Sequence, residues 1–449
     1  MTNEKVLREG SVGKLLLTLS LPVILIMLVQ VLYNMADVYF LGKLGDPIPV
    51  AAVSLAMPVF SVFSAFNTLI GFGGTTAASI ALGRGEHDKV KQYSSFVLYA
   101  GLLFGILMGS CVLIFMNPLL RVLGTNAETA PYTGSYLKIM ALGAPFAIAG
   151  GAMSNVVRVD GDGKSAVISH MSGTLINIIL DPIMILVLGW GVVGAGIATL
   201  LGNLSSFIIL FAVIRRKEAF SVSPKDLSFR PDISLKVLAL GFPMAASTLL
   251  SSFSSVFANR LLVTYGNEAV AAHSVATKAG LLIAMIVMGI SMGMQPAISY
   301  TYGWGNRKRM KQILLGTGLA CIISSTVLAA VFFLGRDAFV RAFLDHAEIL
   351  ALGRRMILGG LAAAPFVGVY QLCSVYLQST GRVAFATITA LLQKGLVYIP
   401  VLYGMNALFA LTGLIFSAAL TDVVSTAVAV VLCLKSAHAK TTAEEPSLT

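Results

Sequence analysis

The sequence is dominated by apolar segments that are long enough to cross a lipid bilayer. A membrane-spanning helix needs about 20 mostly apolar residues. Only 11% of the residues are charged, whereas soluble domains carry about 25%. Polar or glycine-rich breaks separate twelve expected spans, at residues 14–41, 50–81, 92–116, 130–154, 165–189, 192–214, 234–262, 269–300, 311–335, 349–375, 384–404 and 407–434. The sequence therefore predicts an all-α integral membrane protein.

Basic residues set the expected orientation of these spans. An even number of spans leaves both termini on one side of the membrane. If that side is the cytoplasm, 21 of the 31 lysines and arginines lie in cytoplasmic segments. Seven lie in segments on the outer side of the membrane, and three lie within the spans. This distribution follows the positive-inside rule. We expect a multi-pass protein of the cell membrane with cytoplasmic termini, whose net charge of +11 faces anionic lipid rather than nucleic acid.

The two halves of the chain resemble each other. VAAVS at 50–54 recurs as VAAHS at 270–274, and GRGEHDKVKQ at 83–92 recurs as GWGNRKRMKQ at 303–312, both at an offset of 220. Six spans per repeat predict two pseudo-symmetric six-helix bundles, an arrangement typical of transporters that work by alternating access. The expected organisation is an N-lobe at 1–214, a cytoplasmic linker at 215–233, a C-lobe at 234–434 and a cytoplasmic tail at 435–449.

Acidic residues inside the spans are the first candidates for function. Asp37, Asp181 and Asp422 fall in apolar segments, where a charge costs roughly 3 kcal/mol on insertion scales. Helical spacing places further polar residues on the same faces, namely Gln30, Tyr33 and Asn34 with Asp37, Asn177 with Asp181, and Thr199 with Asn203. We expect these faces to point inward, because lipid cannot satisfy polar groups.

These polar faces favour a buried cation-coupling site. Asp37 and Asp181 would be its carboxylates, with Asn177 and Thr199 as further oxygen ligands for Na⁺. The same carboxylates can instead carry H⁺, since burial and a like-charged neighbour raise a carboxyl pKa. Gln30, Tyr33, Asn34 and Asn203 would line a substrate cavity. The alternative for all of them is structural hydrogen bonding between helices, which we expect for His170.

The second half carries a different set of charges in its spans. Asp422 is accompanied by Lys278 and Lys394. These three residues are expected either to form a structural ion pair or to take part in substrate binding or coupling. The sequence has no HExxH or Walker motif. We therefore expect no enzyme activity and no cofactor, and an ion gradient as the energy source.

Several segments carry a resemblance to a known family. They are Tyr33-Asn34-Met35-Ala36-Asp37 with Phe40-Leu41-Gly42, Arg158-Val159-Asp160-Gly161-Asp162, Asn177-Ile178-Ile179-Leu180-Asp181-Pro182, and Gln295-Pro296. Together they resemble the multidrug and toxic compound extrusion (MATE) family, in its prokaryotic MepA-like and DinF-like branches. Other branches also carry acids on the seventh and tenth spans, and this sequence has none there.

The resemblance implies a MATE-type transporter fold and a specific activity. The expected activity is export of small organic, mostly cationic and amphipathic compounds in exchange for Na⁺ or H⁺. By analogy, Asn155 would join the cation site. No obligate protein partner is evident, and a monomer would suffice. The alternative within transport is a lipid-linked oligosaccharide flippase of the same superfamily, which should have a basic cavity.

Overall fold

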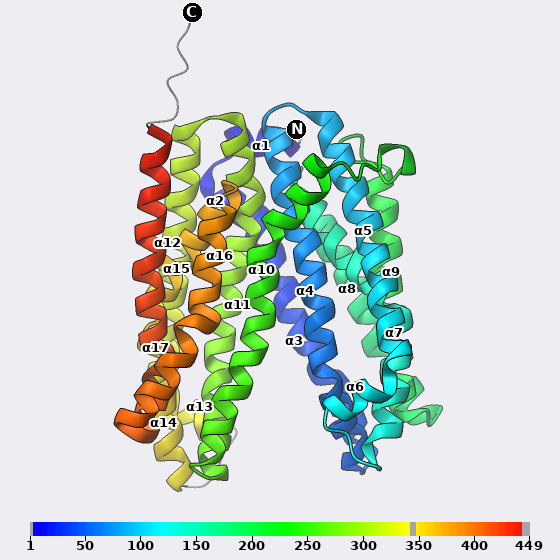
Figure 1. Cartoon of the computed structure of the whole chain (residues 1–449), viewed down its shortest axis with the longest axis vertical. Coiled ribbons are helices and arrows are strands. Elements are labelled where there is room, and N and C mark those ends of the chain that lie inside the picture. The colour runs from blue at the N-terminus through cyan, green and yellow to red at the C-terminus, as the bar shows by residue number, and fades with distance from the viewer. Residues whose placement is uncertain (1–2, 342–346, 442–449) are drawn as a thin grey trace, which may run out of the picture. The chain divides into compact units, whose positions relative to one another are not determined.

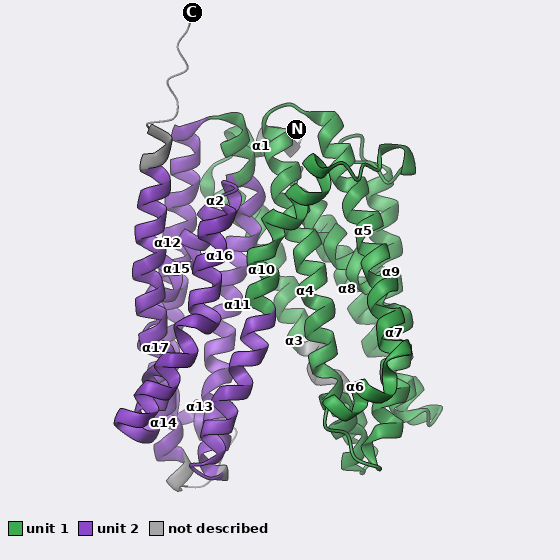
Figure 2. Ribbon diagram, in the orientation of Figure 1, with its two compact units in different colours: residues 1–248, 299–305 green, residues 249–298, 306–449 purple. Residues whose placement is uncertain are grey.

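The computed structural model describes residues 3–341 and 347–441, without the side chains of residues 3–5, 32–38, 267, 347–349 and 438–441. All regular structure in these residues is helical (Figure 1). The chain divides into two compact units (Figure 2). Unit 1 contains residues 1–248 and 299–305, and unit 2 contains residues 249–298 and 306–449.

Unit 1 contains the first nine α-helices. They are α1 (Asn3–Glu9), α2 (Val12–Leu15), the π-helical η1 (Leu16–Ser20), α3 (Leu21–Gly42), α4 (Pro47–Gly83), α5 (His87–Ile114), α6 (Met116–Val122), α7 (Thr129–Val156), α8 (Gly163–Asp181), the π-helical η2 (Pro182–Val187), α9 (Gly191–Arg215) and the 3₁₀ turn η3 (Pro224–Asp226). Two long helices, α10 (Pro231–Val263) and α11 (Asn267–Trp304), contribute to both units. The unit boundary therefore does not test the lobe boundaries expected from the duplication, which stay a prediction.

The remaining helices belong to unit 2. They are α12 (Arg307–Leu334), α13 (Arg336–Arg341), α14 (Ala347–Leu361), α15 (Ala364–Ser379), α16 (Val383–Leu391), the π-helical η4 (Leu392–Leu396) and α17 (Tyr398–Thr441). A glycine allows two of these helices to pack closely, since a Cβ on Gly368 of α15 would lie 2.9 Å from the backbone of Ile322 in α12.

Eleven described segments are long and apolar enough to cross a membrane. The last of them, Val383–Ala437, has 55 residues, roughly 80 Å of helix, whereas the hydrocarbon core is about 30 Å thick. Within it, α17 is interrupted at Ala410, whose φ is 49° and ψ is −135°. The segment therefore supplies two spans, which gives the predicted twelve. The break between them was expected at residues 405–406, and the structure corrects its position to Ala410.

Proline marks irregular backbone in several spans, as expected from its missing N–H. Pro182 follows Asp181 directly and opens η2, and Pro22 lies in the first turn of α3, immediately after η1. Pro365 lies in the first turn of α15, after α14 has ended at Leu361. The predicted span at 349–375 is found as one membrane-crossing segment, Leu350–Ser379, built from the two helices α14 and α15.

Glycines allow the helices of unit 1 to approach closely. Gly101, Gly105 and Gly109 follow one face of α5 at a spacing of four residues. A Cβ added to Gly105 would lie 2.3 Å from the Cα atom of Pro145 in α7. Small residues at contacts between helices are typical of membrane proteins, where packing rather than the hydrophobic effect drives helix association.

A second close approach in unit 1 reflects the duplication. A Cβ on Gly83 would lie 2.1 Å from the carbonyl oxygen of Tyr300, and one on Gly303 would lie 2.2 Å from that of Ile80. Gly83 and Gly303 are 220 residues apart, and so are Ile80 and Tyr300. The contact of Gly83 with Tyr300 and the contact of Gly303 with Ile80 are therefore equivalent under the repeat.

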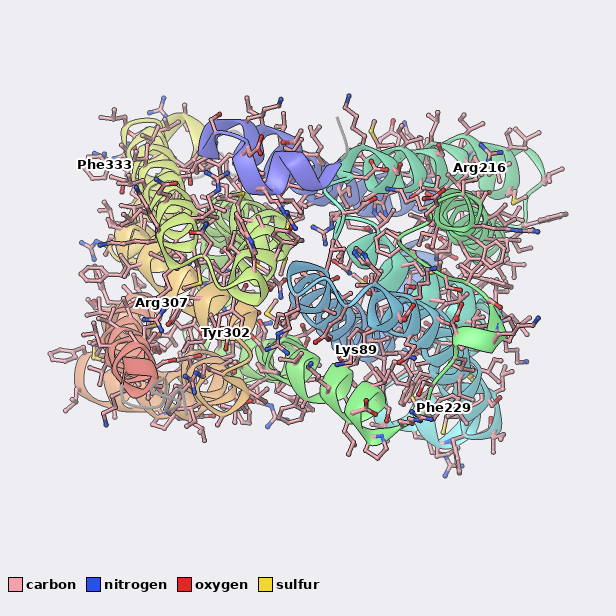
Figure 3. All side chains as sticks on the ribbon, turned by 90° about the horizontal axis from the view of Figure 1, so that it is seen from above. Lys89, Arg216, Phe229, Tyr302, Arg307 and Phe333 are labelled. Carbon is pink, nitrogen blue, oxygen red and sulfur yellow. The ribbon has the colours of Figure 1, made fainter. Side chains whose placement is uncertain are left out.

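The segment between α9 and α10 is fixed to α5. Ser94, Ser95 and Tyr99 donate hydrogen bonds to the carbonyl oxygens of residues 221, 223 and 222, at 3.1, 2.9 and 3.0 Å. The rings of Phe96 and Phe229 meet edge to face, 5.8 Å apart. Figure 3 looks onto the end of unit 1 where Arg216 and Phe229 mark the two ends of this segment. The expected linker is thus a docked segment of unit 1.

Candidate functional site

Unit 1 contains an open cavity of about 510 Å³. Residues of α3, α4, α7, α8 and α9 line it. Its polar wall includes Gln30, Asn67, His170, Thr199, Asn203 and Ser206. Gln30 and Asn203 were predicted to line a substrate cavity, and the structure places both of them here.

Aromatic rings form much of the remaining wall. Phe60 and Phe63 of α4 lie 6.3 Å apart, and Phe60 also meets Tyr136 of α7 at 5.8 Å. Phe146, also on α7, packs on Phe207 of α9 at 5.6 Å. A cavity with aromatic surfaces and a few hydrogen-bonding groups is typical of sites for small organic molecules.

A buried polar group of α8 and α9 reaches this wall. Asn177 is 1% exposed and Asp181 0%, while Thr199 is 4% exposed and lines the cavity. The amide Nδ2 of Asn177 donates to Oγ1 of Thr199 at 3.4 Å. The Oδ1 atom of Asn177 is buried and accepts no hydrogen bond from the described residues. These residues supply the carboxylate, amide and hydroxyl oxygens that a bound Na⁺ would need.

A glycine contact holds α8 against α9 beside this group. A Cβ on Gly173 would lie 2.4 Å from the carbonyl oxygen of Gly202, and one on Gly202 would lie 3.2 Å from Cβ of Asn177. The hydroxyl of Ser206 donates to the carbonyl oxygen of Ser169 at 2.9 Å. The distance between Asn177 and Thr199 thus depends on two helices that are already in backbone contact.

Of the polar residues predicted on the first span, Gln30 of α3 is the one whose side chain the structure describes. Gln30 lines the cavity, and its Oε1 lies 3.2 Å from Nε2 of His170. The side chains of Tyr33, Asn34 and Asp37 lie outside the described residues. The predicted pairing of Asp37 with Asp181 therefore stays a prediction.

Asn155 itself is not among the described residues that line the cavity. Its Nδ2 donates to the carbonyl oxygen of Gly151 at 3.0 Å, and its Oδ1 accepts from Nη2 of Arg158. Arg158 is only 4% exposed although it follows α7 in a loop. Burial lowers the pKa of its guanidinium to about 10. The role of Asn155 in a cation site stays a prediction.

Two carboxylates after Arg158 hold the start of the docked segment. Lys217 lies 2.6 Å from Oδ2 of Asp160 and 2.9 Å from Oδ2 of Asp162. Burial raises the pKa of Asp160, against the opposing hydrogen bond from Lys217. Burial also tends to raise the pKa of Asp162. Hydrogen bonds from Ser165 and Lys217 outweigh this effect, so the pKa of the Asp162 carboxyl is lowered.

In unit 2, the carboxylate of Asp422 lies near Gln393 and Lys394. Oδ1 of Asp422 accepts from Nε2 of Gln393 at 3.0 Å, and Lys394 interacts electrostatically with the same carboxylate. Lys278, on α11, is exposed. The roles of Lys278, Lys394 and Asp422 stay predictions.

Sequence reasoning missed part of the cavity wall. His170 makes the hydrogen bond between helices that was expected of it, with Gln30 of α3, and it also lines the cavity, which was not predicted. Asn67 on α4 also lines the cavity, and Ser61 and Ser64, which precede it at three-residue spacing on the same helix, are the signal that could have singled it out. Among the described residues, no three His, Cys, Asp or Glu side chains are grouped as a metal site would require.

Comparison with known proteins identifies the family. The family model MatE matches residues 22–183 and 243–404, two stretches offset by 221 residues, as the internal repeat predicts. Multidrug export protein MepA of Staphylococcus haemolyticus is 32% identical over 419 residues, which cover 93% of this chain and 92% of that protein. MepA of Staphylococcus aureus strain NCTC 8325 is 32% identical over 413 residues, or 91% of this chain and 90% of that protein.

Solved structures agree on the fold. A crystal structure of MATE in the straight conformation matches with a TM-score of 0.90 at 23% identity, over 98% of this chain and 99% of the other. An outward-facing multidrug resistance MATE family transporter matches with a TM-score of 0.89 at 23% identity, over 98% of each chain. The chain therefore has the MATE fold, twelve spans in two pseudo-symmetric six-helix bundles, and it belongs to the MatE family.

Proposed function

We propose that this protein is a secondary antiporter, not an enzyme, that exports small organic compounds in exchange for Na⁺ or H⁺. The observation that carries the proposal is the cavity of unit 1, where aromatic walls adjoin a buried group of oxygen ligands. Its relatives named multidrug export protein support the same activity. Substrates would be mostly cationic and amphipathic, and transport would proceed by alternating access between the two lobes.

The coupling ion would bind beside the cavity. Asp37 and Asp181 would carry the exchanged charge, and Asn155, Asn177 and Thr199 would complete the site. For Na⁺, the ligands would be Asp37, Asn177, Asp181 and Thr199. We propose that the protein works in the plasma membrane as a monomer with cytoplasmic termini, without a cofactor or a protein partner.

The flippase alternative is less well supported. A site for a lipid-linked oligosaccharide should present Lys or Arg to the pyrophosphate. The described residues that line the cavity of unit 1 include neither Lys nor Arg.

Gradient-driven transport in proteoliposomes tests the proposal. The purified protein is reconstituted, and ethidium accumulation is followed with a Na⁺ gradient alone, a proton gradient alone, and neither gradient. We expect accumulation that one of the two gradients drives and that collapses with the matching ionophore. Absence of gradient-driven movement for ethidium and for other aromatic cations would contradict the proposal.

A further inference from the structure

His170 differs from the other side chains of the cavity wall. Among the described lining residues, it is the only one able to carry a positive charge. It projects from α8 and contacts α3 through its bond to Gln30. The protein has a second half-buried histidine within a span, His273 on α11 of unit 2, which does not line this cavity.

Its hydrogen bond leaves one ring nitrogen for other partners. An amide oxygen can only accept, so Nε2 of His170 donates to Oε1 of Gln30. In the neutral ring, Nδ1 is then an acceptor. Nδ1 makes no hydrogen bond with the described residues, and it is not among the buried side-chain atoms that lack a partner. The ring therefore offers an accessible acceptor at the cavity wall, held in orientation by Gln30.

We propose that His170 determines substrate specificity by accepting a hydrogen bond at Nδ1 from an N–H or O–H group of the bound compound. The inference rests on the proposed export function and adds that, among aromatic substrates, those that carry a hydrogen-bond donor bind more tightly than those that carry none. The rings of Phe60, Tyr136 and Phe146 supply flat apolar surfaces for such compounds. The neutral imidazole serves this role without repelling a cation.

A purely structural role would have a different consequence. If His170 only joins α3 to α8, its loss should impair transport of every substrate alike. If Nδ1 binds substrate, its loss should raise KM only for compounds with a donor. The effect should be about fivefold, the size of one neutral hydrogen bond.

Two aromatic cations of equal charge separate these outcomes. Ethidium carries two aromatic amines, whereas tetraphenylphosphonium carries no hydrogen-bond donor. KM and kcat for both are measured in proteoliposomes with wild type, His170→Leu, His170→Gln and His273→Leu. We expect His170→Leu to raise the KM for ethidium about fivefold and to leave its kcat and both constants for tetraphenylphosphonium unchanged. His170→Gln, which keeps an acceptor, should restore the ethidium KM, and His273→Leu should match wild type.

Other results overturn the inference. An equal change for both cations in His170→Leu, or no change for either, would show that Nδ1 does not select substrates. If His170→Leu does not yield folded protein, His170→Gln together with His170→Phe gives the same comparison with and without an acceptor. A wild type that transports neither cation would refute the proposed export function itself, a result that differs from each of the others.

Discussion

Replacing Gly173 by alanine tests how closely the candidate site depends on the contact between α8 and α9. The added Cβ would lie 2.0 Å from Oγ of Ser206 and 2.4 Å from the carbonyl oxygen of Gly202. Ser206 can rotate away, although it would then lose its hydrogen bond to Ser169. The carbonyl of Gly202 is backbone and moves only if α9 moves.

The size of the effect follows from these distances. A carbon and a carbonyl oxygen approach to about 3.3 Å, so the two helices must separate locally by roughly 1 Å. Overpacking of this kind costs about 1–3 kcal/mol. The bond between Asn177 and Thr199 is already 3.4 Å long, so such a separation would break it. Gly173→Ala should therefore lower both stability and transport.

A matched variant controls for alanine itself. Gly143, on α7 of the same unit, would place its Cβ 3.4 Å from the side chain of Leu200, an ordinary contact. Thermal unfolding in detergent and ethidium transport are compared for wild type, Gly173→Ala and Gly143→Ala. We expect a fall of several degrees and a clear loss of transport in Gly173→Ala only. If Gly173→Ala is as stable and as active as Gly143→Ala, the contact does not support the site.

Further predictions concern the charged group that holds the docked segment. Lys217→Met leaves two neighbouring carboxylates without their shared cation, so it should cost about 1–3 kcal/mol and speed proteolysis of residues 216–230. Lys225→Met, at an exposed position of the same segment, should change neither. The pKa of Asp162 lies below its ordinary value of 3.8, so its contribution to stability is present above that value and is lost as the pH falls through the lowered pKa. Asp162→Asn should therefore flatten the acid-side fall of the thermal midpoint, and Asp160→Asn, which removes a carboxyl with a raised pKa, should steepen it; equal curves for all three proteins would contradict this assignment.

The sequence predicts the spans well where polar residues separate them. It misplaces the break between the last two, because the polar residue of that stretch is Asn406 whereas the backbone turns four residues later, at Ala410. The turn brings the two sides of the break into backbone contact, since a Cβ on Gly413 would lie 1.9 Å from the carbonyl oxygen of Met405. Hydropathy carries no information about such a contact.

The candidate site was predictable in type but not in extent. Helical spacing singled out Asn177 and Asp181, because polar residues on one face of an apolar helix must point away from lipid. Helical spacing shows on which face of a helix a residue lies, but not whether a cavity lies beside it. It therefore could not show that His170 lines the cavity. Burial of Arg158 was also hidden, since a charged residue in a loop is normally exposed.

Coupling through the carboxylates of the first lobe is the central claim, and one measurement tests it most directly. The ion gradient that drives ethidium accumulation in the wild type is applied to Asp37→Asn, Asp181→Asn and Asp422→Asn in proteoliposomes. Each asparagine variant keeps the size of the side chain and removes its exchangeable charge. We predict that gradient-driven accumulation disappears in Asp37→Asn and Asp181→Asn and persists in Asp422→Asn. Accumulation that survives the first two substitutions, or is lost only with the third, would contradict a coupling site in the first lobe.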